Sequence, residues 1–322
     1  MKLIIQIPCY NEEYTLKATL DELPREVVGF DRVEWLIIND GSADKTVEVA
    51  RQCGVDHIIS HAVNRGLARA FVTGLEACLE RGADVIVNTD ADNQYCAADI
   101  QNLVKPILSN EADMVVGARP ISTIKEFSLI KKWLQGLGSK LVRFVSKTNV
   151  KDAPSGFRAF SRSAAQQLHV FNTYTYTLET IIQAGLSGLE VKSVPVGVNP
   201  KSRESRLIRS LPSYLRRSFV TICRILITYR PFSFFTVCSL VFFIPGFALA
   251  VRFVFAYLQG QGQGMVQSLI LSSLLMMIGV LLFAIAVVAE LIAVNRRLLE
   301  KTRWQLHKLE DRLGRTESLK KS

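Results

Sequence analysis

Two long apolar stretches near the end of the chain constrain its fold more than any other feature. Residues 232–258 and 265–294 are almost free of charge, and each is long enough to cross the roughly 30 Å hydrocarbon core of a bilayer as a helix. Both are too long and too apolar for the core helices of a soluble domain. We therefore expect two transmembrane helices there, with residues 1–231 left to form the rest of the fold.

Positive charge flanks these two stretches on their outer sides. The link between them, residues 259–264, is uncharged. The flanks carry Arg216, Arg217, Arg230, Arg296, Arg297, Lys301 and Arg303. Because Lys and Arg accumulate on the cytoplasmic side of membrane helices, we expect a multi-pass protein of the plasma (inner) membrane with both termini in the cytoplasm. The formal net charge of +10 therefore indicates a membrane surface as partner and no nucleic acid.

Short apolar runs alternate with helical patterns in the first part of the chain. Strands are expected at 2–8, 33–38, 57–60, 83–87, 114–117 and 190–198, with helices between the first five. Such alternation is typical of an α/β fold in which helices cover both faces of a mainly parallel, Rossmann-like sheet. Ligands of these sheets bind beyond the carboxyl ends of the strands, so the polar motifs that follow the strands are expected to share one pocket.

The most informative of these motifs follows the fourth strand. Asp90, Asp92 and Gln94 stand at alternate positions, so in an extended segment their side chains project the same way. Three oxygen ligands at the end of a strand suit a hard divalent cation, Mg²⁺ or Mn²⁺. The alternative is a polar loop whose aspartates cap the helix that begins near Ala97.

Several function classes are disfavoured by what the sequence lacks. No Gly-x-Gly-x-x-Gly or Gly-x-x-x-x-Gly-Lys follows a strand, which argues against a dinucleotide oxidoreductase and a P-loop NTPase. The six cysteines form no Cys-x-x-Cys pair, so neither a zinc site nor a disulfide framework is indicated.

The motifs as a set resemble family 2 glycosyltransferases with the GT-A fold. The matching segments are Pro8-Cys9-Tyr10-Asn11-Glu12, Asp40-Gly41-Ser42-x-Asp44-x-Thr46, Asn64-x-Gly66 and Asp90-x-Asp92-x-Gln94. The resemblance implies that Pro8, Tyr10, Glu12, Asp40 and Asp90 bind a nucleotide diphosphate sugar. It also implies that Asp90, Asp92 and Gln94 hold the metal on its diphosphate, with Asp92 counted among the catalytic residues. Asn39 departs from the first Asp of the Asp-Asp-Gly-Ser turn that many relatives have.

A second segment gives a narrower resemblance. Asp152-Ala153-Pro154-Ser155-Gly156-Phe157-Arg158 resembles the Asp-x-x-Ser-Gly-Phe-Arg segment of polyprenyl- and dolichyl-phosphate glycosyltransferases, which implies a lipid phosphate acceptor. Guanidinium groups bind phosphate bidentately, and the candidates are Arg119, Arg158, Arg203 and Arg206. Asp152 is the candidate catalytic base, although an acceptor phosphate is largely ionised near neutral pH, so Asp152 could instead position the acceptor or the sugar. The plain alternative is a loop shaped by Pro154 and Gly156.

Two further stretches combine basic and apolar residues. Residues 125–147 show helical spacing with a Trp and several lysines, which fits an interfacial helix or a helix packed on the sheet with a solvated basic face. The expected organisation is a cytoplasmic catalytic domain at 1–200, basic juxtamembrane helices at 201–231, transmembrane helices at 232–258 and 265–294, and a polar cytoplasmic tail at 295–322.

The function that the resemblance implies is transfer of one sugar, with inversion, from a nucleotide diphosphate sugar to polyprenyl phosphate at the cytoplasmic membrane face. By the same resemblance we expect UDP-glucose as donor and Mg²⁺ or Mn²⁺ as cofactor. A processive polysaccharide synthase is disfavoured because the chain lacks a Gln-x-x-Arg-Trp segment and has only two spans. A membrane-anchored scaffold that binds nucleotide sugar without turnover is the alternative from another class. A homo-oligomer, including a tetramer, is left open.

Overall fold

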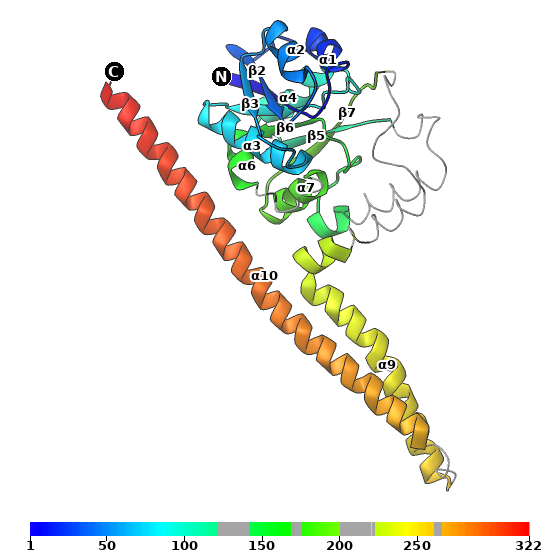
Figure 1. Cartoon of the computed structure of the whole chain (residues 1–322). Helices are drawn as coiled ribbons and strands as arrows, with labels where there is room; N and C mark the ends of the chain where they lie inside the picture. The colour runs from blue at the N-terminus through cyan, green and yellow to red at the C-terminus, as the bar shows by residue number, and fades with distance from the viewer. Residues whose placement is uncertain are drawn as a thin grey trace. The chain divides into compact units, whose positions relative to one another are not determined.

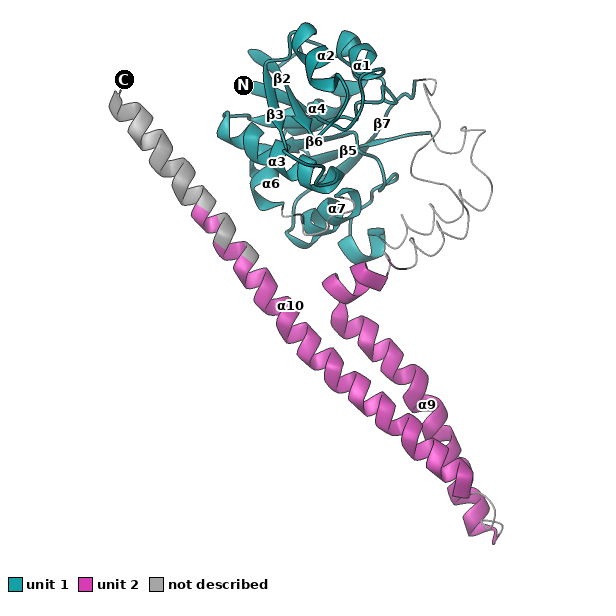
Figure 2. Ribbon diagram, in the orientation of Figure 1, with its two compact units in different colours: residues 1–214 teal, residues 215–322 magenta. Residues whose placement is uncertain are grey.

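The computed structural model divides into two compact units, residues 1–214 and 215–322 (Figure 2). It describes residues 1–120, 142–168, 170, 176–199, 220, 223–260 and 266–321, without the side chains of 300, 303, 304 and 307–321. The expected helix at 125–147 is thus described only from 142, where residues 142–146 are helical. Of the expected juxtamembrane segment at 201–231, residues 201–219, 221 and 222 lie outside the described residues, and these include Arg203 and Arg206.

A seven-stranded sheet forms the centre of the first unit (Figure 1). Its strands are β1 (Lys2–Cys9), β2 (Arg32–Asn39), β3 (His57–Ser60), β4 (Val85–Asn88), β5 (Met114–Ala118), β6 (Arg158–Ser161) and β7 (Val191–Pro195). Their order across the sheet is β3-β2-β1-β4-β6-β5-β7. All neighbouring pairs are parallel except those of β6, which runs antiparallel to both β4 and β5. The expected mainly parallel α/β sheet is confirmed.

Helices cover both faces of this sheet. They are α1 (Leu16–Glu22), α2 (Thr46–Gln52), α3 (Leu67–Glu80), a short 3₁₀ turn η1 (Ala97–Asp99), α4 (Ile100–Leu108), α6 (Arg162–Gln167) and α7 (Thr177–Leu186). On one face, the fully buried Leu3, Ile5 and Ile7 of β1 pack in a core with residues of α1, α2 and α4. On the other face α3 lies close to β1, and its Gly74 leaves room for the side chain of Gln6. Each fully buried Leu or Ile contributes about 1.5–3 kcal/mol to folding.

Strand β6 was not expected from the sequence. It has only four residues, begins with an arginine and shows no alternation of apolar and polar residues, yet Arg158, Ala159 and Phe160 are all fully buried. The register pairs Asn88, the last residue of β4, with Arg158, the first residue of β6. Because β6 is antiparallel, its beginning lies at the carboxyl edge of the parallel strands, and this brings the segment 152–157 to that edge.

The chain leaves β7 along the same edge. Val198 forms an antiparallel bridge with Tyr95, the Asn199 N–H donates to the Gln94 carbonyl at 3.0 Å, and the Asn199 amide donates to Glu22 of α1 at 2.9 Å. Residues 196–199 are therefore tied to the turn that carries the acidic motif.

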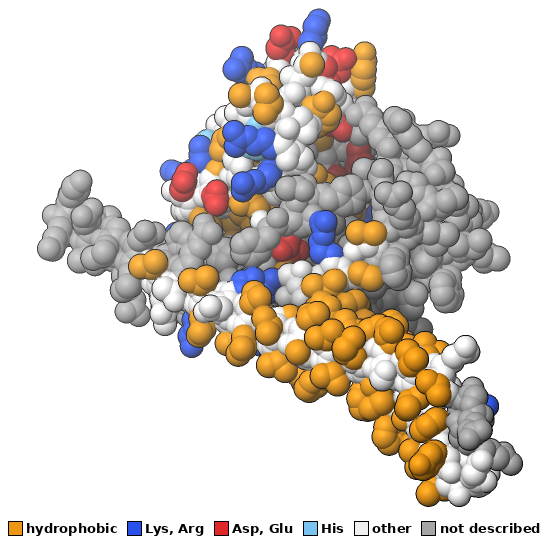
Figure 3. Space-filling view, turned by 60° about the horizontal axis from the view of Figure 1, so that its bottom comes forward, with side chains coloured by type: hydrophobic (Ala, Val, Ile, Leu, Met, Phe, Trp, Pro, Cys, Tyr) orange, Lys and Arg blue, Asp and Glu red, His pale blue; other side chains and the backbone are white. Residues whose placement is uncertain are grey.

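The second unit contains two long helices, α9 (Pro231–Leu258) and α10 (Val266–Lys321). Pro231 stands in the first turn of α9, where its missing N–H costs nothing. Residues 231–258 and 266–299 are long and apolar enough to cross a membrane. Most of their apolar side chains are exposed, and Figure 3 shows them gathered along these helices. The part of the chain expected to be a polar tail continues the α10 helix.

Reciprocal contacts join α9 to α10. The Ser239 hydroxyl donates to the Gly279 carbonyl at 2.7 Å, and the Ser272 hydroxyl donates to the Gly246 carbonyl at 2.7 Å. In each helix the serine precedes the glycine by the same spacing, about two helical turns. A Cβ on Gly279 would lie 2.8 Å from the Phe243 Cβ, so both glycines allow close approach of the helices. Small residues of this kind are typical of helix pairs in membranes.

Candidate active site

The acidic motif lies directly beyond β4, at the carboxyl edge of the sheet. Asp90 is partly buried, and burial raises the pKa of its carboxyl to about 7, with a further contribution from the neighbouring charge of Asp92. Arg119 and Arg158 oppose this rise in the pKa of Asp90 but do not cancel it. Two neighbouring carboxylates repel one another, and a bound cation would relieve that repulsion.

The donor atoms of this turn fit a divalent metal ion of the oxygen-seeking kind. Asp90 and Asp92 supply carboxylates, and Mg²⁺ or Mn²⁺ typically takes one or two carboxylates together with waters and substrate phosphates. The Gln94 side-chain oxygen accepts from Arg119 Nη1 at 3.3 Å, so in this structure Gln94 is engaged with the arginine. Within the described residues no three His, Cys, Asp or Glu side chains group as a metal site, and metal binding by Asp90 and Asp92 stays a prediction.

An ion pair lies beside this turn. Arg119, just after β5, donates from Nε and Nη2 to the two carboxylate oxygens of Asp152, at 2.7 and 3.2 Å. Asp152 is fully buried and Arg119 nearly so, and the Asp152 carboxylate helps to raise the pKa of the guanidinium above its ordinary value. The bidentate geometry fixes both side chains. Arg119 thus links the predicted base to the predicted metal ligand Gln94.

Arg158 does not face the site in the way the sequence suggested. Its side chain is fully buried, and its guanidinium donates to the carbonyls of Ser155 and Ala153, both at 2.7 Å, and to the Thr180 hydroxyl at 2.5 Å. These contacts shape the segment 152–156 from behind. The burial argues against direct contact of Arg158 with an acceptor phosphate, and we assign it to holding the loop.

The predicted nucleoside-binding residues lie on the β1 and β2 side of the same edge. Pro8 is buried near the end of β1, Tyr10 is 44% exposed, and Glu12 accepts from the Thr15 hydroxyl at 2.7 Å. The exposed ring of Tyr10 is available to a ligand. For these residues nucleoside binding stays a prediction.

Asp40 is placed differently, since its oxygens are used within the protein. It is 3% exposed and accepts from the backbone N–H groups of Arg65 and Gly66 at 2.9 and 2.8 Å. His61 Nδ1 lies 2.7 Å from Asp40 Oδ1. Asp40 therefore orders the loop 61–66 that precedes α3, and any contact with a nucleoside stays a prediction.

The turn after β2 also explains the departure at Asn39. The Asn39 amide donates to the Ser60 hydroxyl at 3.2 Å and accepts from the Ser42 N–H at 2.9 Å. Ser42 and Thr46 in turn accept from the N–H groups of Asn11 and Glu12. An amide can donate and accept at once, which an aspartate cannot do. This part of the motif thus serves to lock the first two loops together.

The sequence did not single out three residues that surround the acidic turn. Asn88, Tyr95 and Tyr176 all contact Gly156, and an added Cβ on Gly156 would lie 2.8 and 2.9 Å from the carboxylate oxygens of Asp90. The only sequence signal was the glycine of the Ser-Gly-Phe-Arg segment, because nothing in a strand pattern marks a buried Asn or Tyr as part of a site.

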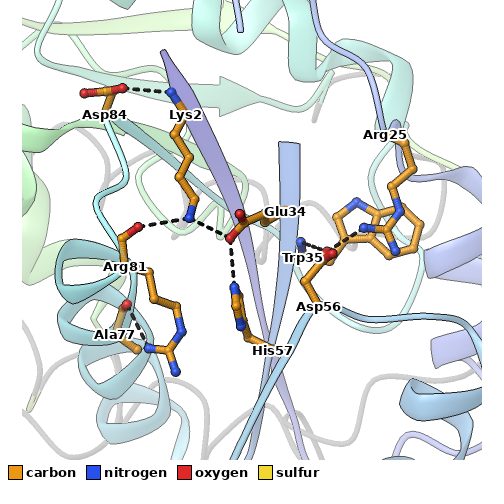
Figure 4. Close-up of polar contacts among 9 residues, drawn as sticks. All are labelled: Lys2, Arg25, Glu34, Trp35, Asp56, His57, Ala77, Arg81 and Asp84. Atoms are coloured by element: carbon orange, nitrogen blue, oxygen red, sulfur yellow. Dashed lines mark hydrogen bonds and ion pairs between the residues drawn. The ribbon is translucent and has the colours of Figure 1, made fainter. Parts of the chain in front are cut away.

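A different polar cluster stands at the opposite edge of the sheet (Figure 4). Glu34 accepts from Lys2 and His57, each at 2.8 Å, which joins β1, β2 and β3 near their amino ends. These contacts lower the pKa of the Glu34 carboxyl even though burial raises it. Arg25 pairs with Asp56 and lies over the Trp35 ring. The cluster fixes strand register away from the site.

A mostly parallel sheet with an Asp-x-Asp turn at its carboxyl edge defines a GT-A-type glycosyltransferase domain. The model for the family described as glycosyl transferase family 2 matches residues 4–168. The chain belongs to glycosyl transferase family 2, as its motifs suggested.

Comparison with individual proteins agrees with this assignment. The UDP-N-acetylglucosamine–dolichyl-phosphate N-acetylglucosaminyltransferase of Methanococcus voltae is 32% identical over 214 residues, covering 59% of this chain and 82% of that protein. The undecaprenyl-phosphate mannosyltransferase of Micrococcus luteus is 26% identical over 206 residues, covering 61% and 83%.

Among solved structures, a glucosyl-3-phosphoglycerate synthase from Mycobacterium tuberculosis, in complex with Mn²⁺, UDP and glucosyl-3-phosphoglycerate, superposes with a TM-score of 0.55 at 20% identity. The match covers 71% of this chain and 79% of that one. The likeness confirms the fold.

Proposed function

We propose that this protein transfers one sugar from a nucleotide diphosphate sugar to a polyprenyl phosphate. The observation that carries the proposal is the meeting of the Asp90–Asp92 turn with the buried Arg119–Asp152 ion pair at one edge of the sheet. Relatives named for dolichyl-phosphate and undecaprenyl-phosphate acceptors support the lipid phosphate. Two apolar helices support membrane association, and we propose the cytoplasmic face of the plasma membrane as the place of reaction.

The donor is proposed to bind along the carboxyl edge. Tyr10 and Glu12 would contact the nucleoside, while Asp90, Asp92 and Gln94 would hold Mg²⁺ or Mn²⁺. Such an ion, when bound, neutralises charge on the leaving diphosphate. We propose UDP-glucose as the donor, on the resemblance alone.

The acceptor is proposed to be held by arginine. One oxygen of its phosphate attacks the anomeric carbon from the face opposite the diphosphate, the bond to the diphosphate breaks, and the sugar is transferred with inversion. Arg119 offers a guanidinium that Asp152 orients, and Arg203 and Arg206 remain candidates in the following segment. Both carboxylate oxygens of Asp152 accept from Arg119, and an ionised phosphate needs no base. We therefore propose that Asp152 positions Arg119 and does not act as a base.

The first test is a direct transfer assay. Purified protein in detergent receives undecaprenyl phosphate, Mn²⁺ or Mg²⁺ and one of a panel of radiolabelled UDP- and GDP-sugars, and label is followed into the organic phase. One donor is expected to label the lipid, and EDTA or Asp92→Ala is expected to abolish the signal. Donor binding without labelled lipid from any donor would contradict the proposal and favour a nucleotide-sugar-binding scaffold. Long polymer in the absence of lipid would favour a polysaccharide synthase.

The role of Asp152 is tested by Asp152→Asn in the same assay. If Asp152 only orients Arg119, the variant is expected to have reduced turnover and the same pH profile as the unsubstituted protein. If Asp152 is a base, the unsubstituted protein is expected to show an acid limb that the variant lacks. Arg51→Lys, on the exposed surface of α2, is the control for the effects of substitution and purification as such.

A further inference from the structure

The Asp90 carboxylate lies against Gly156, and neighbouring side chains hold the peptide groups of Gly156 in place. An added Cβ on Gly156 would stand 2.8 Å from Asp90 Oδ2 and 2.9 Å from Asp90 Oδ1, so the glycine backbone forms the wall behind the carboxylate. Gly156 precedes β6 and lies beyond the ladder that joins β4 to β6. Its peptide groups must therefore find partners among side chains.

Three side chains from separate parts of the chain supply these partners. The Gly156 N–H donates to the Tyr95 hydroxyl oxygen at 3.0 Å. The Gly156 carbonyl accepts from the Asn88 amide at 2.8 Å and from the Tyr176 hydroxyl at 3.4 Å. The Asn88 amide also lies 2.9 Å from the Tyr176 hydroxyl oxygen. Both polar groups of this glycine are thus held by side chains.

The three side chains are themselves fixed in the interior. Asn88 is fully buried and accepts from the Gln6 amide at 2.9 Å. The Tyr176 ring stacks on Phe71 with centroids 3.8 Å apart, and the Tyr95 ring stacks on Phe157 at 5.0 Å.

A buried polar network of this kind needs a reason. Burying an amide costs free energy unless its hydrogen bonds are made, and apolar residues at positions 6 and 88 would fill the sheet without that requirement. The hydrogen-bond network ends at Gly156, and Gly156 lies against the Asp90 carboxylate. Networks that hold the ligands of a metal in place are a recurrent feature of metal sites.

We propose that Asn88, Tyr95 and Tyr176 are positioning residues for Asp90, which act by clamping the Gly156 peptide. The inference rests on the proposed metal-binding role of Asp90. The clamp keeps the carboxylate in the geometry that the cation requires, and the three residues act from the interior, where they are at most 4% exposed.

The test measures Mn²⁺ binding directly on the full-length protein in detergent. Free Mn²⁺ is followed by electron paramagnetic resonance during titration in the presence of UDP, so the result does not depend on turnover. Tyr95→Phe and Tyr176→Phe each remove one hydroxyl and keep the ring stack. The dissociation constant for Mn²⁺ is expected to rise about three- to tenfold in each, the effect of losing one buried hydrogen bond. Tyr14→Phe, at an 89% exposed position, is the matched control and should bind as the unsubstituted protein does.

A second variant tests the contact with Asp90 more directly. Gly156 has no left-handed backbone conformation, so the backbone tolerates Gly156→Ala, and the added Cβ presses on the Asp90 carboxylate and also lies 3.0 Å from the Tyr176 hydroxyl oxygen. Its Mn²⁺ dissociation constant is expected to rise by tenfold or more while thermal unfolding stays cooperative.

The outcomes separate this inference from the function that it builds on. Unchanged Mn²⁺ affinity in folded Tyr95→Phe, Tyr176→Phe and Gly156→Ala, beside normal binding by the unsubstituted protein, would overturn the clamp and leave the proposed function intact. No Mn²⁺ binding by the unsubstituted protein with UDP would overturn both.

Discussion

Asp90 is held in a position that costs the metal-free protein stability. Its pKa lies near 7, against an ordinary value near 4, because the carboxyl is buried beside Asp92. Between about pH 4 and pH 7 the folded state therefore keeps a proton that the unfolded state releases. The metal-free fold loses stability as pH rises through this window, and the loss is complete above pH 7.

This gives a prediction for Asp90→Asn. Without metal, at pH 7.5, the variant is expected to unfold at a higher temperature than the unsubstituted protein, because it removes the buried charge. The difference should shrink toward pH 5, and sugar transfer should be lost. Thermal unfolding in EDTA at several pH values checks this. An equal or lower unfolding temperature at pH 7.5 would contradict it.

Arg119 gives a second prediction at the same scale. Arg119→Lys keeps the positive charge but loses the bidentate contact with Asp152 and the hydrogen bond to Gln94. Hydrogen bonds to charged groups contribute about 1.5–3 kcal/mol, so kcat/KM is expected to fall about 10- to 100-fold, and the unfolding temperature is expected to fall as well because Asp152 loses part of its pairing in the interior. Steady-state kinetics with the identified donor provide the measurement, and Arg51→Lys is the control. Wild-type kcat/KM in Arg119→Lys would remove Arg119 from the site.

Strand β6 was harder to predict than the other strands. The strands at 2–8 and 33–38 were predicted within two residues, because long apolar runs identify strands by themselves. Strand β6 was not, since its arginine is hydrogen-bonded to carbonyls and a hydroxyl that no local pattern reveals. The acidic turn could be predicted from alternation, whereas the contacts of Asn88 and Tyr176 with Gly156 could not, because they depend on the antiparallel pairing of β6 with β4.

The paired helices α9 and α10, the two candidate membrane spans, are the elements with the clearest mutational test. Ser239→Ala and Ser272→Ala each remove one hydroxyl bond to a glycine carbonyl, and such bonds in membranes average about 0.6 kcal/mol. Each variant is expected to unfold at slightly lower SDS fraction. Gly279→Leu is expected to lose far more, because its side chain would meet the backbone of Phe243.

Unfolding in mixed micelles, followed by circular dichroism, provides the measurement. Ser273→Ala is the matched control, since the Ser273 hydroxyl donates to Ile270 within its own helix and its loss should leave α9 and α10 paired. Equal effects of Ser272→Ala and Ser273→Ala would show that the interhelical bond contributes nothing.

At the scale of the whole molecule, the predicted topology can be tested by labelling. The uncharged link between the two spans is expected to face outward, so Gln259→Cys should react with a membrane-impermeant maleimide in intact cells. Tyr14→Cys in the catalytic unit should react only after the cells are opened. The unsubstituted chain, with its six cysteines, measures the background. Labelling of Tyr14→Cys in intact cells would contradict the predicted orientation.

The reciprocal serine–glycine contacts also limit how α9 and α10 can move relative to one another. A single interhelical hydrogen bond would let one helix rotate about that point. Two such bonds at different positions along the helices oppose both rotation and sliding. Since Ser239 meets Gly279 and Ser272 meets Gly246, a slip of one helical turn, about 5.4 Å, would release both contacts together. We therefore expect α9 and α10 to move as one rigid unit, which either keeps this register or loses both contacts.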